Sequence, residues 1–399
     1  MKLLVIGSRI PYPLNDGGAI ATFNMLKGLA KEGHTITYLS LNTNKHHASP
    51  AVIEKHFNFL HSVIPFDINT DVKPVPAFLN LFSRQSYNIQ RFKNKGFDAL
   101  LKKTIQDNAF DIIHFEGLFT TPYIDTARQY SNAPAILRQH NVEFRIWEKL
   151  AEETSNRLKK NYIRLLARRL KQFETSVVSK FNAIVCIAAT DTAEMQNWQG
   201  IPSLRTIHTG FEIPETLVIS TFIPGSVYHI GSMEWMPNRQ AMEWFHSAIW
   251  PLAESKNNTI NFHMAGKNMP ELYKQWQTAR FNVYGEVSDA ATFSADKQIL
   301  AVPLLSASGI RIKTIEAILQ GKPVVTTTPG AAGLPLENGK HCLIADTAEA
   351  FANALLLLCS DHAKAMSMAA AARELMTKNF ELKSVSAEWT AFYQSMLNR

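Results

Sequence analysis

The sequence predicts an α/β protein made of two doubly wound domains of parallel sheet, and three observations support this. Apolar, β-branched runs typical of strands alternate with helical patterns along most of the chain. The alternation forms two series separated by a short break near residue 220. At 399 residues, the chain is also too long for one ordinary core. We therefore expect domains over 1–219 and 220–380, and a helix over 381–399 that packs back toward the first domain.

The first series opens with a βαβ unit. Its strands are expected over Lys2–Ile6 and Thr35–Leu41, with a helix over Gly17–Lys31 between them. Residues 44–109 show no clear pattern. Further strands, each beside a helical stretch, are expected at Phe110–Phe115, Ala135–Gln139, Ala183–Ile187 and Arg205–His208.

The second series follows a connector that Pro224 and Gly225 punctuate. Residues 346–399 contain only helical patterns, so helices are expected to pack outside the second sheet. The expected strands of this series are Val227–Ile230, Asn261–Ala265, Phe281–Tyr284, Gln298–Pro303, Pro323–Thr327 and Cys342–Ala345.

Several classes of protein are disfavoured by what the sequence lacks. No apolar run approaches the ~18 residues of a membrane span, and polar residues interrupt any apolar stretch near the start, so we expect a cytoplasmic protein. GxGxxG and GxxxxGK[ST] motifs are missing, which argues against a nicotinamide dehydrogenase and an ATPase. Without HExxH, paired CxxC or an Asp-x-Asp pair, the sequence favours chemistry that needs neither a metal nor a cofactor.

The strongest positive signal lies at Ser306–Glu316, between a predicted strand and a predicted helix. A helix N-terminus offers unpaired N–H groups to an anion, and Arg311 and Lys313 would add two cations suited to a diphosphate. Glu316 lies one turn later, where a carboxylate would accept bonds from two ribose hydroxyls. The alternative is that these three side chains simply face solvent.

A weaker signal precedes the first predicted helix. Gly17 and Gly18 would open that helix with N–H groups directed toward a phosphate, although a plain turn explains them equally well. Glu116, directly after the predicted strand Phe110–Phe115, is also expected to contact substrate.

Together these segments resemble the family 4 nucleotide-sugar glycosyltransferases, whose GT-B arrangement places two Rossmann-like domains facing each other across a cleft. The resemblance spans nearly the whole chain, and the order and spacing of its pieces make it specific. It rests on Lys2–Gly7 with Pro11, Pro13, Gly17 and Gly18, on Arg138–Glu143, on Ile207–Phe211, on Gly231–Asn238, on Ser308–Glu316 and on Gly321–Val325.

The resemblance implies a donor site mainly in the second domain and an acceptor site mainly in the first. His140 would face the reacting sugar, Gly18 would approach the diphosphate, and Glu316 would bind the ribose. Catalysis would involve His140, Arg311 and Lys313. The remaining expected substrate-binding residues are Gly17, Glu116, Gly231, Ser232, Gly285, Val287, Ser308, Gly309 and Ile310.

Two departures from the family pattern stand out. The family usually carries two glutamates eight positions apart, but here Ser308 occupies the first position and only Glu316 remains. The Gly-Arg pair that many members use for phosphate is here Gly231-Ser232. Our hypothesis is that Arg311 and Lys313 supply the missing positive charge.

If the family's retention of configuration carries over, front-face attack is expected, with the leaving diphosphate accepting the acceptor proton. Catalysis would then depend on cations and a helix terminus that stabilise the departing charge. His140 as a general base is a second possibility, and a structural histidine is a third.

A basic segment lies within a helix predicted over Trp147–Ser179. Helical spacing places an apolar side at Leu158, Tyr162, Leu165 and Phe173, and a basic stripe, within residues 157–171, at Arg157, Lys160, Arg164, Arg168 and Lys171. Such a stripe attracts anionic lipid, a lipid diphosphate or nucleic acid. The bland alternative is a solvated face with salt bridges to Glu152 and Glu153.

We therefore expect a transferase that uses a nucleotide-sugar donor and a glycan or lipid-linked acceptor in polysaccharide assembly. Peripheral contact with the inner face of the plasma membrane through residues 157–171 is an added expectation, and no nucleic-acid partner is expected. The alternatives are a nucleotide-sugar epimerase of the same architecture and a non-catalytic protein that binds membranes or nucleic acid.

Overall fold

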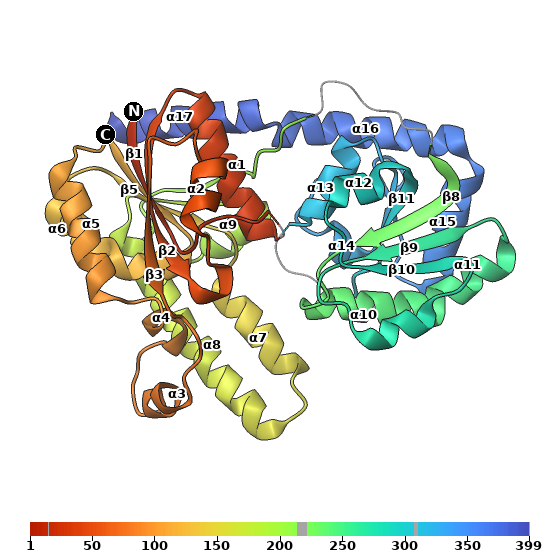
Figure 1. The fold of residues 1–399 in the computed structure, drawn as a ribbon, viewed down its shortest axis with the longest axis horizontal. Coiled ribbons are helices and arrows are strands. Elements are labelled where there is room, and N and C mark those ends of the chain that lie inside the picture. Colours follow the sequence, from red (N-terminus) through yellow and green to blue (C-terminus); the bar gives the residue numbers. More distant parts are fainter. Residues whose placement is uncertain (15, 214–221, 307–309, 399) are drawn as a thin grey trace. The chain divides into compact units, whose positions relative to one another are not determined.

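The computed structural model describes residues 1–14, 16–213, 222–306 and 310–398 (Figure 1). These residues form two compact units. Unit 1 comprises residues 1–210 and 382–399, and unit 2 comprises residues 211–381. The sequence placed the domain boundary between residues 219 and 220, whereas the units divide after Gly210. Residues 214–221 lie outside the described part of the chain.

Unit 1 contains a sheet of seven parallel strands in the order β3-β2-β1-β4-β5-β6-β7. The predicted strands all form, and β3 is an addition that the sequence pattern did not indicate. Its residues, at the sheet edge, are mostly half-buried and include Pro65 and Asp67, so it lacks a continuous apolar run. The strands are β1 (Lys2–Gly7), β2 (Thr35–Thr43), β3 (Ser62–Ile68), β4 (Ile112–Glu116), β5 (Ala135–Gln139), β6 (Ala183–Cys186) and β7 (Leu204–Thr206).

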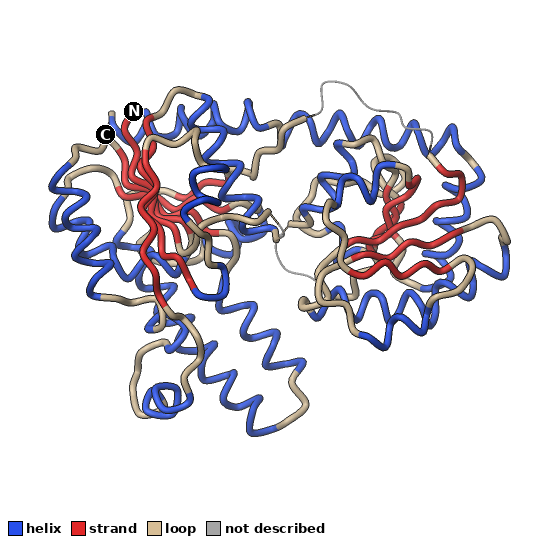
Figure 2. The backbone as a smooth tube through the Cα atoms, viewed as in Figure 1, coloured by secondary structure: helices blue, strands red, loops and turns tan. Residues whose placement is uncertain are grey.

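Helices cover both faces of this sheet, as Figure 2 shows. Alternate side chains of β1 divide between two cores: Leu4 and Ile6 pack with α5 (Lys95–Asp107), α6 (Ile124–Tyr130) and α8 (Arg157–Val177). Leu3 and Val5 pack with α1 (Gly17–Lys31), α2 (Pro50–His56) and α17 (Leu382–Leu397). The other helices of unit 1 are α3 (Pro74–Asn80), α4 (Tyr87–Gln90), α7 (Glu143–Glu153) and α9 (Ala189–Met195), with 3-10 turns at Asn44–His46, Leu118–Tyr123 and Val178–Lys180.

The helix α17 returns to the unit in which the chain begins. Its residues Trp389, Phe392 and Tyr393 are buried in the same core as Leu3 and Val5. The helix also packs tightly on α1, because a Cβ added at Gly28 would lie only 2.0 Å from the Ser386 hydroxyl. The C-terminal helix is thus an integral part of the core of unit 1.

The single helix predicted over Trp147–Ser179 is wrong, because the structure contains two helices there. In Figure 1, α7 and α8 lie side by side as a hairpin that projects from the sheet. The Asn156 side chain accepts a bond from Lys159 N at 3.0 Å and so caps the start of α8. Leu158, predicted on an apolar face, is 84% exposed because the projecting end of the hairpin reaches beyond the core.

Unit 2 contains six parallel strands in the order β10-β9-β8-β11-β12-β13, with helices on both sides. The strands are β8 (Ile223–Ile230), β9 (Asn261–Ala265), β10 (Phe281–Gly285), β11 (Lys297–Val302), β12 (Val324–Thr326) and β13 (Leu343–Ile344). The helices are α10 (Met236–Trp244), continued by a π-helical turn at Phe245–Ile249, α11 (Trp250–Lys256), α12 (Ala290–Ala295), α13 (Ile312–Leu319), α14 (Thr328–Ala331), α15 (Ala348–Ser360) and α16 (His362–Phe380), with a 3-10 turn at Glu271–Trp276.

The predicted connector at Pro224 and Gly225 is also wrong, since both residues lie inside β8. Gly225 has φ +75°, and its N–H donates to the Gln298 side chain at 2.8 Å. The register between β8 and β11 shifts at this point. This irregularity lets a strand contain a Pro-Gly pair that a regular ladder would exclude.

The strand orders confirm the predicted fold class of two Rossmann-like, doubly wound parallel sheets with C-terminal helices. In each sheet the order reverses once, between β1 and β4 in unit 1 and between β8 and β11 in unit 2. Open α/β sheets bind ligands outside the carboxyl ends of the strands at such a reversal. Among the described residues, no helix has the length and apolar character needed to cross a membrane.

Candidate active site

In unit 1, a buried carboxylate organises the carboxyl ends of β4 and β5. Glu116 ends β4, is 4% exposed, and accepts bonds through Oε1 from Arg138 Nη1 at 2.7 Å and from His140 Nε2 at 2.6 Å. The Thr22 hydroxyl of α1 donates to the same oxygen at 2.9 Å. Oε2 lies 2.9 Å from Nε2 of His114. Both oxygens are therefore occupied within the protein.

The protonation state of this network follows from its contacts. Burial acts to raise the pKa of Glu116, but the charges of Arg138 and then His140, with hydrogen bonds from two histidines, hold it well below its usual value. Burial lowers the pKa of His114, against the opposing effect of Glu116. Glu116 is thus an ionised acceptor, and its partners must be donors.

His140 lies in the turn after β5 and contacts this carboxylate. Because ionised Glu116 only accepts, Nε2 of His140 carries a proton and Nδ1 is left for another contact. A Cβ placed on Gly18 would lie 3.7 Å from Nδ1 of His140 and 2.9 Å from Nη2 of Arg9. Gly18 therefore brings the start of α1 close to both side chains.

The start of α1 already has a carboxylate cap. Asp16 Oδ1 accepts a bond from Ala19 N at 3.0 Å, and Asp16 pairs with Arg9, with 2.8 Å between Nη1 and Oδ2. Burial raises the pKa of Asp16, but the hydrogen bond and charge of Arg9, together with the bond from Ala19 N and the charge of His46, outweigh it, so the net shift is downward. The exposed Gly17 begins the helix beside this pair.

Sequence reasoning missed Arg9, Thr22, His114 and Arg138. The last two had a usable signal, because each is a basic side chain that directly follows or interrupts the apolar run of a predicted strand. Both are fully buried. Charged or polar groups in a buried strand require specific partners, which would have pointed to a network.

In unit 2, Lys313 occupies the first turn of α13, at the reversal between β8 and β11. Its Nζ lies 3.1 Å from Nε2 of His229 and donates to Oδ1 of Asn238 at 3.0 Å. Nδ1 of His229 lies 2.9 Å from the Ala301 carbonyl, which only accepts, so Nδ1 carries the proton and Nε2 accepts from Lys313. Burial, and then the charge of Lys313, hold the pKa of His229 well below its usual value.

The pKa of the Lys313 amine lies close to neutral pH. Burial, with a smaller effect from Arg311, lowers its pKa to about 7. Arg311 is 5% exposed and its guanidinium lies 5.1 Å from the centre of the Trp235 ring. Burial lowers the pKa of Arg311 to about 10. Two cations thus lie close together at a helix start, an arrangement that an anion would stabilise.

A glycine lies at the carboxyl end of each of the neighbouring strands β8, β9 and β10, and the glycine after β8 lies beside Lys313. A Cβ on Gly231 would lie 2.7 Å from Nδ2 of Asn238 and 3.1 Å from Nζ of Lys313. A Cβ on Gly266 would lie 1.9 Å from the Gly231 carbonyl oxygen, and Gly266 N donates to Gly285 O at 2.7 Å. Asn238 Nδ2 also donates to the Ser232 carbonyl at 2.8 Å. The structure therefore brings together the expected residues Gly231, Ser232 and Lys313.

The remaining expected residues of unit 2 lie at the end of β10 or just after it, or belong to the segment around α13. Glu316 is half-buried on α13, and burial raises its pKa to about 7. Gly285 adopts φ +71°, a value that favours glycine, and half-buried Val287 follows it. Ile310 precedes α13, whereas Ser308 and Gly309 lie outside the described residues. Within the described residues, no group of three or more His, Cys, Asp or Glu side chains is arranged to hold a metal ion.

Two doubly wound units with parallel sheets are the architecture of the GT-B glycosyltransferases. Residues 15–213 match the family model described as Glycosyltransferase Family 4, and residues 224–361 match the model described as Glycosyl transferases group 1. The two matches together span most of the sequence. The chain belongs to glycosyltransferase family 4, and it is a glycosyltransferase.

One relative in sequence covers almost the full length. It is an uncharacterized 44.6 kDa protein in the cps region of Klebsiella pneumoniae. The two are 20% identical over an alignment of 396 positions that covers 96% of this chain and 97% of that protein.

Solved structures of similar fold also match end to end. HepE of Anabaena in complex with UDP has a TM-score of 0.68 at 12% identity, covering 99% of this chain and 100% of that one. Sucrose-phosphate synthase of Thermosynechococcus elongatus has a TM-score of 0.72 at 14% identity, with both chains fully covered. TarM of S. aureus has a TM-score of 0.70 at 12% identity, with 98% of each chain covered. At these identities the likeness establishes the fold.

Proposed function

We propose that this protein transfers a hexose from a nucleoside-diphosphate sugar to a hydroxyl of a glycan or lipid-linked saccharide, with retention of configuration and without a metal or other cofactor. The observation that carries the proposal is the half-buried Lys313 beside Arg311 at the start of α13, at the strand reversal of unit 2. A diphosphate is the anion that two close cations and a helix terminus suit. The complexes of HepE with UDP and with UDP-glucose support a donor of this class.

Unit 2 would hold the donor. Lys313 and Arg311 would contact the diphosphate. Gly231 lets the side chains of Asn238 and Lys313 lie against the main chain, because a Cβ there would be only 2.7 Å from Nδ2 of Asn238. Glu316 would accept bonds from the ribose hydroxyls, and the main chain at Gly285 and Val287 would line the base. Ser232, Gly309 and Ile310 would add polar contacts to the phosphates, and Ser308 would approach the sugar.

In the proposed reaction, an acceptor oxygen forms a bond to the anomeric carbon as the bond from that carbon to the diphosphate oxygen breaks. The departing diphosphate takes the acceptor proton, so no protein base is required. Lys313 and Arg311 stabilise the charge that develops on the diphosphate. Lys313, with a pKa of about 7, would be driven to its protonated form by this anion.

Unit 1 would supply His140 to the reacting sugar, and Gly17 and Gly18 would approach the phosphates. Glu116 has a different role from the substrate contact first expected. It is 4% exposed and both its oxygens are engaged, so we assign it as a positioning residue that fixes the ring of His140 through Nε2. Nδ1 of His140 would then contact a sugar hydroxyl or, in the alternative mechanism, accept a proton.

We further propose a cytoplasmic role in surface polysaccharide assembly, with residues 157–171 contacting the inner face of the plasma membrane. The relative in the Klebsiella pneumoniae cps region supports the pathway class. The same fold is consistent with a nucleotide-sugar epimerase, which would turn over its donor without any acceptor.

The test begins with a thermal-shift screen of nucleoside diphosphates and their hexose derivatives, because a ligand of the native state raises its melting temperature. The hit is then incubated with acceptor saccharides in the presence of EDTA, and the product anomer is determined by NMR. Transfer with retention in EDTA supports the full proposal. An inverted product excludes retention, dependence on added metal excludes the metal-free mechanism, and acceptor-independent epimerisation excludes the transferase.

A further inference from the structure

An apolar segment is exposed on the surface of unit 1. It covers residues 72–82, which include the helix α3. Five large apolar side chains of this segment are each 60 to 81% exposed: Val72, Val75, Phe78, Leu79 and Phe82. A cluster of this kind is unfavourable in water and marks an interaction surface.

Polar contacts hold the backbone of this segment in place. Arg169 of α8 donates through Nη1 to the Asn80 carbonyl at 2.8 Å and through Nη2 to the Leu81 carbonyl at 3.0 Å. Lys73 N donates to the Tyr87 hydroxyl at 3.0 Å. Asn80 is buried and Phe78 and Phe82 contact each other, with ring centres 5.7 Å apart. The segment is thus fixed on its polar side while its apolar side chains face outward.

The neighbouring helix α8 presents basic side chains to solvent. At about 100° per residue, Arg157, Arg164 and Arg168 share one side of α8, and Leu158 lies toward the side of Arg169, which contacts the apolar segment. Leu158 is 84% exposed. Around α8, the apolar segment therefore lies on the side of Arg169 and Leu158, about 100 to 120° from the basic side.

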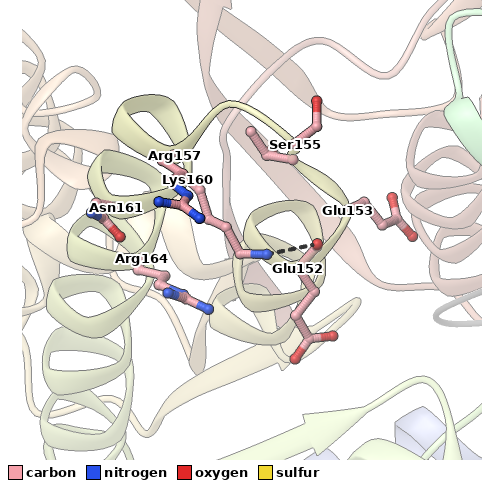
Figure 3. Close-up of a pocket in the computed structure, with 8 residues that line it drawn as sticks. Glu152, Glu153, Ser155, Arg157, Lys160, Asn161 and Arg164 are labelled. Carbon is pink, nitrogen blue, oxygen red and sulfur yellow. Dashed lines mark hydrogen bonds between the residues drawn. The ribbon is translucent and has the colours of Figure 1, made fainter.

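The groove between α7 and α8 shows how these cations are placed (Figure 3). It has a volume of about 580 Å³ and carries Arg157, Lys160 and Arg164 from α8 opposite Glu152 near the end of α7. Lys160 donates to the Glu152 carbonyl at 3.1 Å. Across the part of the chain that the structure describes, no carboxylate lies within 4.0 Å of the guanidinium of Arg157, Arg164 or Arg168. The salt bridges of the bland interpretation are therefore not formed.

We propose that residues 72–82 and the basic side of α8 form a docking surface for an anionic lipid bilayer. The apolar side chains insert among the acyl chains near the headgroups, and the arginines contact lipid phosphates. Lys73 and Arg84, both exposed, flank the apolar segment and add to its positive charge. The inference deepens the proposed function, on which it rests for its purpose, because it would bring the enzyme to a lipid-linked acceptor.

Charge argues for a bilayer over a second copy of this chain. A symmetric dimer through this surface would place the same arginines of two copies near each other, and like charges repel. An anionic membrane instead complements both the apolar and the basic part of the surface.

The test is cosedimentation of the full-length protein with vesicles of phosphatidylglycerol and phosphatidylcholine, compared with phosphatidylcholine alone. We expect binding to the anionic vesicles that weakens in high salt. Phe78→Ser with Phe82→Ser should reduce the vesicle partition coefficient at least tenfold. Arg157→Gln, Arg164→Gln and Arg168→Gln together should reduce it about a hundredfold, since each basic residue near the surface contributes roughly fivefold.

Matched controls carry the same chemical changes elsewhere. Leu272→Ser, at a leucine of unit 2 that is 60% exposed, removes an exposed apolar side chain, and Lys95→Gln with Lys102→Gln and Lys103→Gln removes three cations of α5. The controls should leave vesicle binding unchanged, and all variants should keep the melting temperature because every site is exposed. Equal losses in the controls, or no binding to anionic vesicles, would overturn the docking surface. So would a concentration-dependent dimer that Phe82→Ser dissociates.

Nucleotide binding separates this inference from the proposed function. UDP binding by the surface variants, measured by calorimetry, should equal that of the unaltered protein. Intact UDP binding without vesicle binding defeats only the docking surface. Vesicle binding without recognition of any nucleoside diphosphate defeats only the transferase proposal.

Discussion

Nε2 of His140 lies 2.6 Å from Oε1 of Glu116, and the same oxygen accepts a bond from Arg138 at 2.7 Å. A single buried carboxylate oxygen thus orients a histidine and neutralises an arginine. This arrangement fixes which nitrogen of His140 is available for a ligand, because Nε2 is already committed.

His140→Ala should lower kcat while leaving UDP affinity unchanged, because the proposed nucleotide contacts belong to unit 2. Loss of a single sugar contact corresponds to about tenfold in kcat, whereas loss of a general base corresponds to about a hundredfold or more. Steady-state kinetics with calorimetric UDP binding distinguishes the two roles. A parallel loss of UDP affinity would contradict the assignment of His140 to the sugar.

Glu116→Gln should destabilise the protein by about 3 kcal/mol, because it leaves Arg138 buried without its counter-charge. For a unit of this size, that change lowers the melting temperature by roughly 10 °C. Since the folded pKa of Glu116 is depressed, its stabilisation is present above about pH 4.5 and lost as the pH falls further. The variant should therefore lose less stability on acidification. Glu153→Gln on the exposed end of α7 is the control, expected to leave the denaturation midpoint in place.

Lys313→Ala should weaken binding of UDP and of the donor by about ten- to a hundredfold, since it removes a charge-assisted contact of roughly 1.5 to 3 kcal/mol. Lys274→Ala, an exposed lysine of unit 2 that pairs with Glu271, provides the matched control. Isothermal titration calorimetry measures both. Unchanged donor affinity in Lys313→Ala would refute the idea that Lys313 replaces the family's arginine.

UDP affinity should also fall as the pH rises above about 7. Lys313 has a folded pKa of about 7, so the free protein increasingly holds it neutral above that pH, while an anion binds the protonated amine. Affinity should drop by up to tenfold per pH unit, with proton uptake on binding. Glu316 titrates near the same pH, so the measurement belongs in a Glu316→Gln background. Lys313→Arg should flatten the profile, and a profile that stays steep in that variant would assign the titration to another group.

Gly231→Ala should reduce UDP affinity more than it reduces stability. The new Cβ would lie 2.7 Å from Asn238 Nδ2 and 3.1 Å from Lys313 Nζ, so both flexible side chains must shift from the site. Gly266→Ala is a harsher comparison, because its Cβ would lie 1.9 Å from the Gly231 carbonyl oxygen, and the backbone must move. We expect Gly231→Ala to fold with weakened UDP binding, and Gly266→Ala to lower the melting temperature markedly. Normal UDP affinity in folded Gly231→Ala would show that the positions of Asn238 and Lys313 do not matter for UDP binding.

The strands were predictable because most are continuous apolar runs buried on both faces. Where burial is partial, the pattern failed: β3 lies at an edge, and the break between α7 and α8 carries no Gly or Pro. Pro224 and Gly225 wrongly indicated a connector, because a local irregularity in the pairing of β8 lets the strand contain both residues.

The residues of the candidate site also fall into a group that the sequence predicted and a group that it did not. Lys313 was predicted because the segment Ser306–Glu316 has the residue types of an anion site, and Gly231 was predicted from the family resemblance. The network around Glu116 was not, because its members come from separate elements that only the tertiary fold brings together. His114 and Tyr393, whose side chains are 2.8 Å apart, are 279 positions apart in sequence.

The placement of α17 determines when unit 1 can finish folding during synthesis. Trp389, Phe392 and Tyr393 fill a core whose first strand is made from Lys2 to Gly7, so that core stays incomplete while unit 2 is translated. Unit 2, continuous from Phe211 to Glu381, meets no such delay. A released chain that ended at Glu381 would therefore hold a complete second unit together with a first unit that has an open apolar face, the condition in which chaperones would be needed most.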